Sequence, residues 1–136
     1  MKLHHYRTRI EWTGNRGEGT TGYTAYDRAY TVSAYGKPDI EGSADPAFRG
    51  DASRWNPEEF LLAGLSACHK LWYLHLCAVN GVTVMAYEDE SEAVMDETAG
   101  RFVSARLKPR VMVSAGSDVE KALALHHAEH KACFIA

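Results

Sequence analysis

The chain has 136 residues, of which 46% are hydrophobic, a size and composition typical of one compact domain with its own core. Its formal net charge of -3 gives no basic field for a phosphate backbone, so nucleic acid is not expected as a partner. No apolar run approaches the roughly 18 to 20 residues of a membrane span, and the first residues lack the apolar stretch of a signal peptide. Three cysteines, a small and odd number, are typical of a reducing compartment. We therefore expect a single cytoplasmic domain over residues 1–136, with no membrane or nucleic-acid partner.

The first third of the chain is predicted to form strands and turns. Side chains alternate with period two from His4 to Trp12, and residues 13–20 break this pattern with three glycines. Residues 23–35 are rich in Tyr, Thr and Val and end at a Gly-Lys-Pro turn, which favours a further strand. A polar loop with Pro46 and Gly50 follows over residues 43–54.

A long helix is predicted to begin after this loop. Asn56 is suited to the N-cap, Pro57 to the first helical position and Glu59 to the capping-box position, and Asn80-Gly81 is the next clear stop. The helix is then about 24 residues long, nearly seven turns. Because its leucines and Trp72 occupy most sides, we expect it to be buried nearly all round.

The rest of the chain is predicted to add two strands and a second helix. Residues 82–90 and 102–113 alternate as strands do. Ser117 and Glu120 have the spacing of a capping box, which starts a helix that runs toward Cys133. Strands at each end of a long helix favour an α+β fold with largely antiparallel sheets.

The cysteines differ in what they can do. Cys68 and Cys77 lie nine residues apart on the long helix, on opposite faces and about 13 Å apart along the axis, so they cannot form a disulfide with each other. Free cysteine is often simple core packing, which we expect for Cys77. A reactive Cys68 needs a nearby cation to lower its pKa, and neither His69 nor His75 has the right direction or distance.

A second group of residues has the spacing of metal ligands. His126, His130 and Cys133 stand at i, i+4 and i+7, on one face of the second helix. No fourth ligand is evident. In the first turn of the long helix, Glu58 and Glu59 already have a structural reason to be acidic, because they offset the helix dipole.

The segment from Asn56 to Cys68, Asn-Pro-Glu-Glu-Phe-Leu-Leu-Ala-Gly-Leu-Ser-Ala-Cys, resembles the central-helix motif of the OsmC/Ohr family of osmotically induced and organic hydroperoxide resistance proteins. Residues 16–20, Arg-Gly-Glu-Gly-Thr, and residues 125–136, which end in Cys-Phe-Ile-Ala, extend the likeness over nearly the whole chain. After the motif, Cys-His-Lys-Leu-Trp-Tyr-Leu-His is closer to an OsmC-like branch than to the best-known hydroperoxide reductases.

The resemblance implies an OsmC-like fold and an intertwined homodimer with two active sites at the subunit interface. It makes Cys68 the peroxidatic cysteine, Cys133 the resolving cysteine, Glu58 the active-site glutamate and Arg16 the arginine that stabilises the thiolate. Family members are expected to continue into a short final strand, whereas this chain ends at Ala136 and leaves Cys133 near its terminus. Two arginines of the polar loop are alternatives to Arg16, namely Arg49 and Arg54.

The expected function is that of a thiol peroxidase, with a hydroperoxide as substrate, an external dithiol as reductant, and no metal or other cofactor. Cys68 would become a sulfenic acid and then form a disulfide with Cys133. Because Glu58 lies about 15 Å before Cys68 along one helix, it would have to reach the Cys68 of the partner subunit. Two other readings are a protein that binds a metal at His126, His130 and Cys133 or an apolar ligand in the dimer cleft, and a stress-response protein whose thiol is slow.

Overall fold

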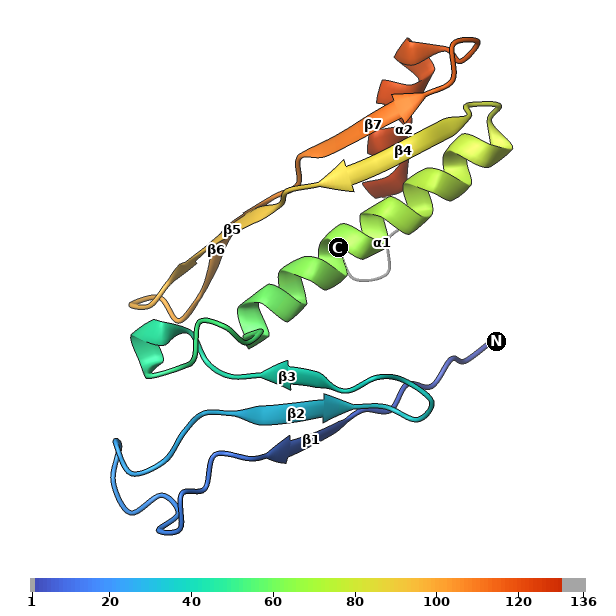
Figure 1. Cartoon of the computed structure of the whole chain (residues 1–136). Helices are drawn as coiled ribbons and strands as arrows, with labels where there is room; N and C mark the ends of the chain where they lie inside the picture. Colours follow the sequence, from blue (N-terminus) through green and yellow to red (C-terminus); the bar gives the residue numbers. More distant parts are fainter. Residues whose placement is uncertain (1, 131–136) are drawn as a thin grey trace. The chain divides into compact units, whose positions relative to one another are not determined.

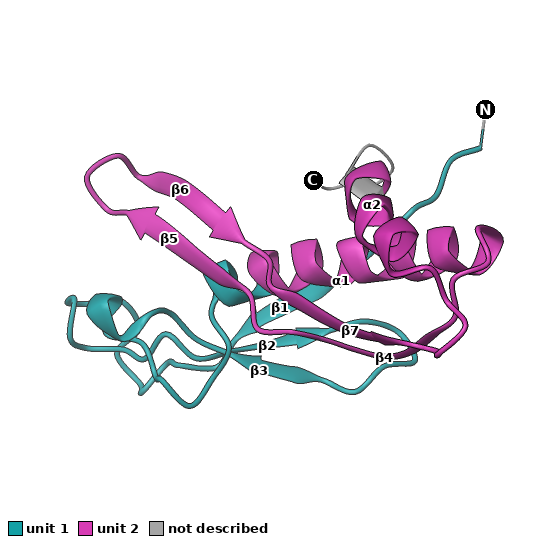
Figure 2. Ribbon diagram, turned by 90° about the horizontal axis from the view of Figure 1, so that it is seen from above, with its two compact units in different colours: residues 1–60 teal, residues 61–136 magenta. Residues whose placement is uncertain are grey.

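The computed structural model describes residues 2–130 of the chain, with side chains described as far as residue 128. The chain divides into two compact units, unit 1 over Met1–Phe60 and unit 2 over Leu61–Ala136 (Figure 2). The described residues form two α-helices, a short 3-10 helix and antiparallel strands (Figure 1), so the predicted α+β class is confirmed. No helix of the described part is long and apolar enough to cross a membrane.

Unit 1 is built on an antiparallel sheet of three short strands in the order β1-β2-β3. These are β1 (Arg9–Trp12), β2 (Tyr30–Ser33) and β3 (Ile40–Gly42), and β2 pairs with both neighbours. The two predicted strands are present but shorter than predicted, because residues 4–8 lie outside β1 and turns and bends occupy residues 23–26 before β2. The sequence prediction missed β3, whose three residues are too few for a clear period.

A close packing contact fixes the end of this sheet. Gly42 is paired with Tyr30 across β2 and β3, and a Cβ atom added to Gly42 would lie 2.3 Å from the Tyr30 ring. Only glycine lets the ring lie over the neighbouring backbone at this distance. Tyr30 is thereby held against β3.

The long helix α1 (Pro57–Val79) begins at the end of unit 1 and continues into unit 2. Asn56 and Glu59 form the predicted capping box: the Glu59 amide donates to Asn56 Oδ1 at 2.9 Å, and the Asn56 amide donates to Glu59 Oε1 at 3.1 Å. Gly81, just beyond the helix, has a φ of 77° and provides the left-handed turn that ends it. Both predicted ends of the helix are confirmed.

Unit 2 contains two separate two-stranded sheets. The first pairs β4 (Val84–Asp89) with β7 (Pro109–Val113), and the second pairs β5 (Glu92–Asp96) with β6 (Arg101–Arg106). The prediction of one strand over residues 102–113 is wrong, because the chain changes from one sheet to the other before Pro109. Proline has no amide hydrogen for the ladder and is tolerated at the start of a strand. The strand β5 was not predicted.

The second helix, α2 (Val119–His130), begins with a different cap from the one predicted. Asp118 Oδ1 accepts a hydrogen bond from the Lys121 amide at 3.1 Å, so Asp118 is the capping residue. The predicted capping box of Ser117 and Glu120 is wrong. Ser117 Oγ instead accepts from the amide of Thr83 at 3.1 Å and so joins the start of α2 to the segment before β4.

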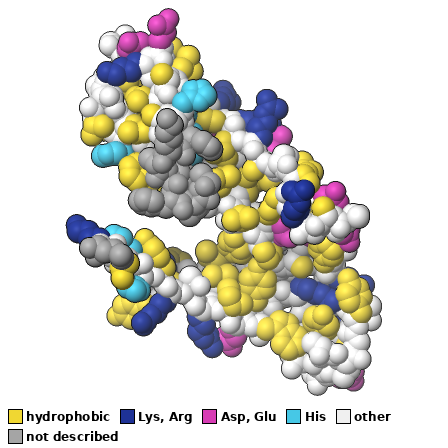
Figure 3. Space-filling view, turned by 180° about the vertical axis from the view of Figure 1, so that it is seen from behind, with side chains coloured by type: hydrophobic (Ala, Val, Ile, Leu, Met, Phe, Trp, Pro, Cys, Tyr) yellow, Lys and Arg dark blue, Asp and Glu magenta, His cyan; other side chains and the backbone are white. Residues whose placement is uncertain are grey.

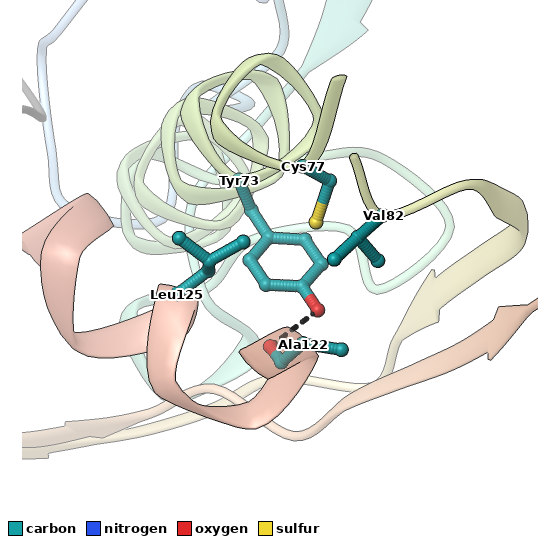
Figure 4. Packing of buried hydrophobic residues seen from close by; sticks show 5 residues of the cluster. All are labelled: Tyr73, Cys77, Val82, Ala122 and Leu125. Atoms are coloured by element: carbon teal, nitrogen blue, oxygen red, sulfur yellow. Dashed lines mark hydrogen bonds between the residues drawn. The ribbon is translucent and has the colours of Figure 1, made fainter. Parts of the chain in front are cut away.

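The described core is small and lies in unit 2, between α1, α2 and the segment just before β4 (Figure 4). Its buried hydrophobic members are Tyr73, Cys77, Val82, Ala122 and Leu125. The Tyr73 hydroxyl donates to the carbonyl of Ala122 at 2.7 Å, which ties α1 to α2. The expectation that Cys77 is core packing is confirmed, since only 1% of its surface is exposed.

The expectation that α1 is buried nearly all round is wrong for the single chain. Leu61, Leu71 and Val79 are 59%, 64% and 65% exposed. Hydrophobic side chains are also open to solvent over much of the face drawn in Figure 3. These side chains of α1 are therefore left uncovered by the described part of the chain.

Candidate functional site

The two cysteines of the described part lie in different environments. Cys68, on α1, is partly exposed, whereas Cys77 is sealed in the core. Burial raises the pKa of the Cys77 thiol, although a hydrogen bond with Tyr73 acts in the opposite direction. A thiol kept protonated and away from solvent is a poor nucleophile, so Cys68 is the better candidate for thiol chemistry.

A carboxylate anchors the helix just before Cys68. Ser66 Oγ donates to Asp89 Oδ2 at 2.6 Å, and Asp89 Oδ1 accepts from the backbone amide of Lys108 at 2.7 Å. The side chain of Asp89, at the end of β4, thus links α1 to the residue just before β7. Sequence reasoning missed Asp89, because nothing in its strand pattern distinguishes it from the other acids of residues 88–92.

Arg16 lies in a loop of unit 1, and its side chain is held by residues of the same loop. Its guanidinium donates to the backbone carbonyls of Thr24 and Ala25, and its Nη1 is 3.9 Å from the carboxylate of Asp27. Asn15 Oδ1 shapes the loop by accepting from the amides of two glycines, at 2.9 and 3.0 Å. The side chain of Arg16 is 52% exposed.

Glu58 lies in the first turn of α1 and is partly buried. It forms no ion pair with Arg16 in the part of unit 1 that is described, so the two-pronged pairing that would orient the arginine is not present in this state. Its charge acts on Tyr30 instead: burial raises the pKa of the Tyr30 hydroxyl, and the negative charge of Glu58 raises it further. Tyr30 was not identified from the sequence as a site residue.

The two alternative arginines differ in their contacts. Arg54 Nη2 is 2.8 Å from the Glu41 carboxylate, and its Nε is 3.8 Å from the carboxylate of Asp51. Arg49 forms no hydrogen bond or ion pair through its side chain with any described residue. Arg54 is thus already neutralised by carboxylates, and Arg49 is not.

Two histidines meet in unit 2 where α2 packs on α1. His69 Nε2 and His126 Nδ1 are 2.9 Å apart, and the His126 ring is stacked on Tyr73 with ring centres 3.9 Å apart. The pKa of His126 is lowered, chiefly by burial and then by the neighbouring His69 and His127. The sequence excludes His69 as a helper of Cys68 and puts His126 in the candidate metal set, and the structure joins these two side chains to each other.

The remaining predicted site residues lie outside the described part. Cys133 lies beyond it, so its disulfide with Cys68 stays a prediction. The same holds for the metal set, because neither Cys133 nor the side chain of His130 is described. Within the described side chains, no group of three His, Cys, Asp or Glu residues is arranged to hold a metal ion.

Comparison with known proteins assigns the chain to a family. The sequence model described as OsmC-like protein matches residues 50–136, which contain all of α1, Cys68 and Cys133. The chain belongs to the OsmC-like family. No curated protein matches the chain in sequence.

Solved structures agree with this assignment. An OsmC-like protein of unknown function from Vibrio cholerae is 27% identical, with a TM-score of 0.85 over 98% of this chain and 92% of its own. The organic hydroperoxide resistance protein OhrB of Bacillus subtilis is 22% identical, with a TM-score of 0.57 over 95% of this chain and 87% of its own. An organic hydroperoxide resistance protein from Legionella pneumophila is 19% identical, with a TM-score of 0.62 over 98% and 88%. The last two likenesses support the OsmC-like fold.

Proposed function

We propose that this OsmC-like protein is a thiol peroxidase that reduces organic hydroperoxides, with Cys68 as the attacking thiol. The observation that carries the proposal is the partial exposure of Cys68 on α1, within the motif that the family match covers. Cys77, the other cysteine of the described part, is excluded by its burial. Hydroperoxide resistance proteins among the structural neighbours support the same class of substrate.

The chemistry needs only thiols, protons and the peroxide. The Cys68 thiolate attacks one peroxide oxygen, the O–O bond breaks, and the other oxygen leaves as an alkoxide that takes a proton to become an alcohol. Cys68 is then a sulfenic acid. The thiol of Cys133 attacks this sulfur and releases water, which leaves a Cys68–Cys133 disulfide. An external dithiol is oxidised as it reduces that disulfide by exchange.

Arg16 is proposed as the cation that keeps Cys68 as a thiolate. Its contacts in this state are two backbone carbonyls and a distant carboxylate, and a thiolate is a stronger partner than a neutral carbonyl. Glu58 is proposed to orient the arginine by a two-pronged hydrogen bond in the reduced enzyme. Because Glu58 and Cys68 are separated by ten residues of α1, about 15 Å along its axis, the proposed contact comes from the partner in a homodimer.

Intact-mass analysis tests the thiol chemistry. After one equivalent of an organic hydroperoxide, the reduced wild-type protein should lose two hydrogens, and Cys133→Ser should gain one oxygen, mapped to Cys68. Cys77→Ala is the matched control and should behave as wild type does. An unmodified Cys68 in both wild type and Cys133→Ser would rule out the peroxidase.

Mixed dimers test the shared site. Chains carrying Cys68→Ser and chains carrying Glu58→Ala are each expected to be inactive alone. Mixed and reassembled, they form heterodimers in which one site keeps both Cys68 and Glu58, so about half of the heterodimer's sites should recover. No recovery, with heterodimers verified by mass, would show that the glutamate does not act across the interface.

A further inference from the structure

Unit 1 contains a cavity that the proposed thiol chemistry does not use. Its volume is about 390 Å3, and its walls come from residues 27–29, from Ser43, and from residues 49–51 together with Arg54. Three arginines and two aspartates line it, which leaves one positive charge in excess. Ser43 is only 1% exposed, and its Oγ accepts a hydrogen bond from the Asp51 amide at 3.1 Å, which ties two of these stretches together.

The backbone of Arg49 is in a conformation that arginine rarely adopts. Its φ of 63° makes it the only residue other than glycine with positive φ in the described part of the chain. The preceding 3-10 helix η1 (Pro46–Phe48) fixes this state, because the Arg49 amide donates to the Pro46 carbonyl at 3.1 Å. The Gly50 amide adds a bond to the Asp45 carbonyl at 3.1 Å. Glycine would take this position at lower cost, so an arginine here indicates a role for its side chain.

Of the three arginines that line the cavity, Arg49 is the one whose side chain has no partner among the described residues. Arg28 donates to the carbonyls of Tyr26 and Tyr23 at 2.7 and 2.8 Å, and its guanidinium lies 3.9 Å from the centre of the Tyr26 ring. Arg54 is paired with Asp51 and with Glu41. The exposed side chain of Arg49 has no hydrogen bond or ion pair with a described residue.

The negative charges of the cavity are already paired, so they do not cancel Arg49. Asp27 has the guanidinium of Arg16 at 3.9 Å, and Asp51 has that of Arg54 at 3.8 Å. In addition, Arg54 Nη1 is buried without a hydrogen-bond acceptor among the described residues. This nitrogen has almost no accessible surface, so an anion would reach it only after the guanidinium turned toward the cavity. An unsatisfied buried donor in the wall still favours negative charge nearby.

We propose that the cavity binds a small oxyanion, a phosphate or a carboxylate, with Arg49 as its principal ligand and Arg28 and Arg54 as the charged wall. Planar guanidinium groups recognise both chemistries by paired hydrogen bonds. A second positive group and a shaped cavity distinguish this place from a single exposed arginine. The proposed ligand is an anion that is bound and not reduced, so this site goes beyond the peroxidase activity proposed for Cys68.

Thermal unfolding of the full chain with sodium phosphate tests the proposal, with sodium chloride of equal ionic strength as the reference. Phosphate should raise the midpoint of unfolding in a saturable way, because a ligand that binds only the folded state stabilises it. Sodium acetate, titrated in the same way, distinguishes a carboxylate site from a phosphate site. An equal effect of all three salts would show screening only and would overturn the proposal.

Substitution of Arg49 separates binding from folding. Arg49→Gly relieves the backbone conformation, so its unfolding midpoint without phosphate should be equal to or above that of wild type, while the phosphate affinity should fall at least tenfold. Lys37→Ala is the matched control, because it removes one exposed charge from a turn of unit 1 outside the cavity, and it should bind as wild type does. Cys68→Ser should also bind phosphate normally. Unchanged affinity in Arg49→Gly would refute the assignment.

Discussion

At the scale of single residues, the two described cysteines show how the surroundings of a side chain decide its chemistry. Cys68 and Cys77 are nine positions apart on the same helix, yet one is partly open and the other is 1% exposed. Sequence arithmetic separated them correctly, because helix periodicity puts them on opposite faces. It could not identify Tyr30 or Asp89, whose roles depend on contacts with distant residues.

Alkylation should distinguish the two cysteines. In the reduced native protein, iodoacetamide is expected to modify Cys68 within minutes and to leave Cys77 unmodified, since the pKa of the Cys77 thiol is raised by burial and the reagent cannot reach it. Peptide mapping by mass spectrometry measures both sites. Modification of Cys77 at a rate similar to that of Cys68, without unfolding, would contradict the described core.

Gly42→Ala should destabilise the protein by about 1 to 3 kcal/mol, because the new methyl group overlaps the Tyr30 ring and forces a shift of the β2–β3 pair. Gly22→Ala is the matched control. Gly22 is also in unit 1, has no atom within 4 Å of an added Cβ and has no positive φ, so its substitution should change stability little. Urea unfolding at one protein concentration compares the two variants. Equal stability of both would mean that Tyr30 does not lie over Gly42.

At the scale of elements, the packing of α2 on α1 rests on few contacts. They include the stack of Tyr73 on His126, the His69–His126 hydrogen bond and the hydrogen bond from Tyr73 to the Ala122 carbonyl. The sequence predicted α1 well because its cap, its first-turn proline and its final glycine agree. It misplaced the cap of α2 by one residue, because Ser117 and Asp118 are both good caps and Ser117 is used by Thr83.

Acidification should weaken this packing. The pKa of His126 in the folded chain lies below its usual value of 6.5, so the unfolded chain binds the proton more readily. The stabilisation by neutral His126 is therefore complete above about pH 6.5 and is lost as the pH falls from there toward the folded pKa. The free energy of unfolding should change by at most about 1.4 kcal/mol per pH unit for the titration of one group.

Urea unfolding between pH 8 and pH 5 measures this effect. His126→Phe keeps an aromatic ring against Tyr73 but cannot take a proton, so its stability should depend less on pH over this range. His5→Gln removes an exposed histidine of unit 1 and should leave the pH dependence as in wild type. A pH profile of His126→Phe as steep as that of wild type would show that another group is responsible.

At the scale of the whole molecule, the described chain leaves much apolar surface uncovered. Its buried hydrophobic residues are five, all in unit 2, whereas α1 carries exposed Leu61, Leu71 and Val79. Large exposed apolar areas typically mark an interface. The homodimer that the family resemblance implies would cover α1 and explain why its sequence is apolar on nearly all sides.

Leu71→Glu should therefore weaken self-association by at least tenfold, because a charge would be buried at the interface. Sedimentation velocity over a range of concentrations measures the dimer fraction. Lys70→Glu, at an exposed neighbouring position on α1, is the control for added negative charge and should have the smaller effect. A wild-type chain that is monomeric at all concentrations would remove the basis for a site shared between subunits.

The sequence by itself determined what depends on neighbours along the chain: the extent and caps of α1, the α+β class, the opposite faces of Cys68 and Cys77, and the family motif around Cys68. These follow from hydrogen bonds and periodicities that span a few residues. Tertiary structure decided the rest, because strand pairing and side-chain contacts join residues tens of positions apart. It divided the second half into two small sheets, joined His69 to His126, bound Arg16 to its own loop, and left Arg49 beside a cavity with an unused charge.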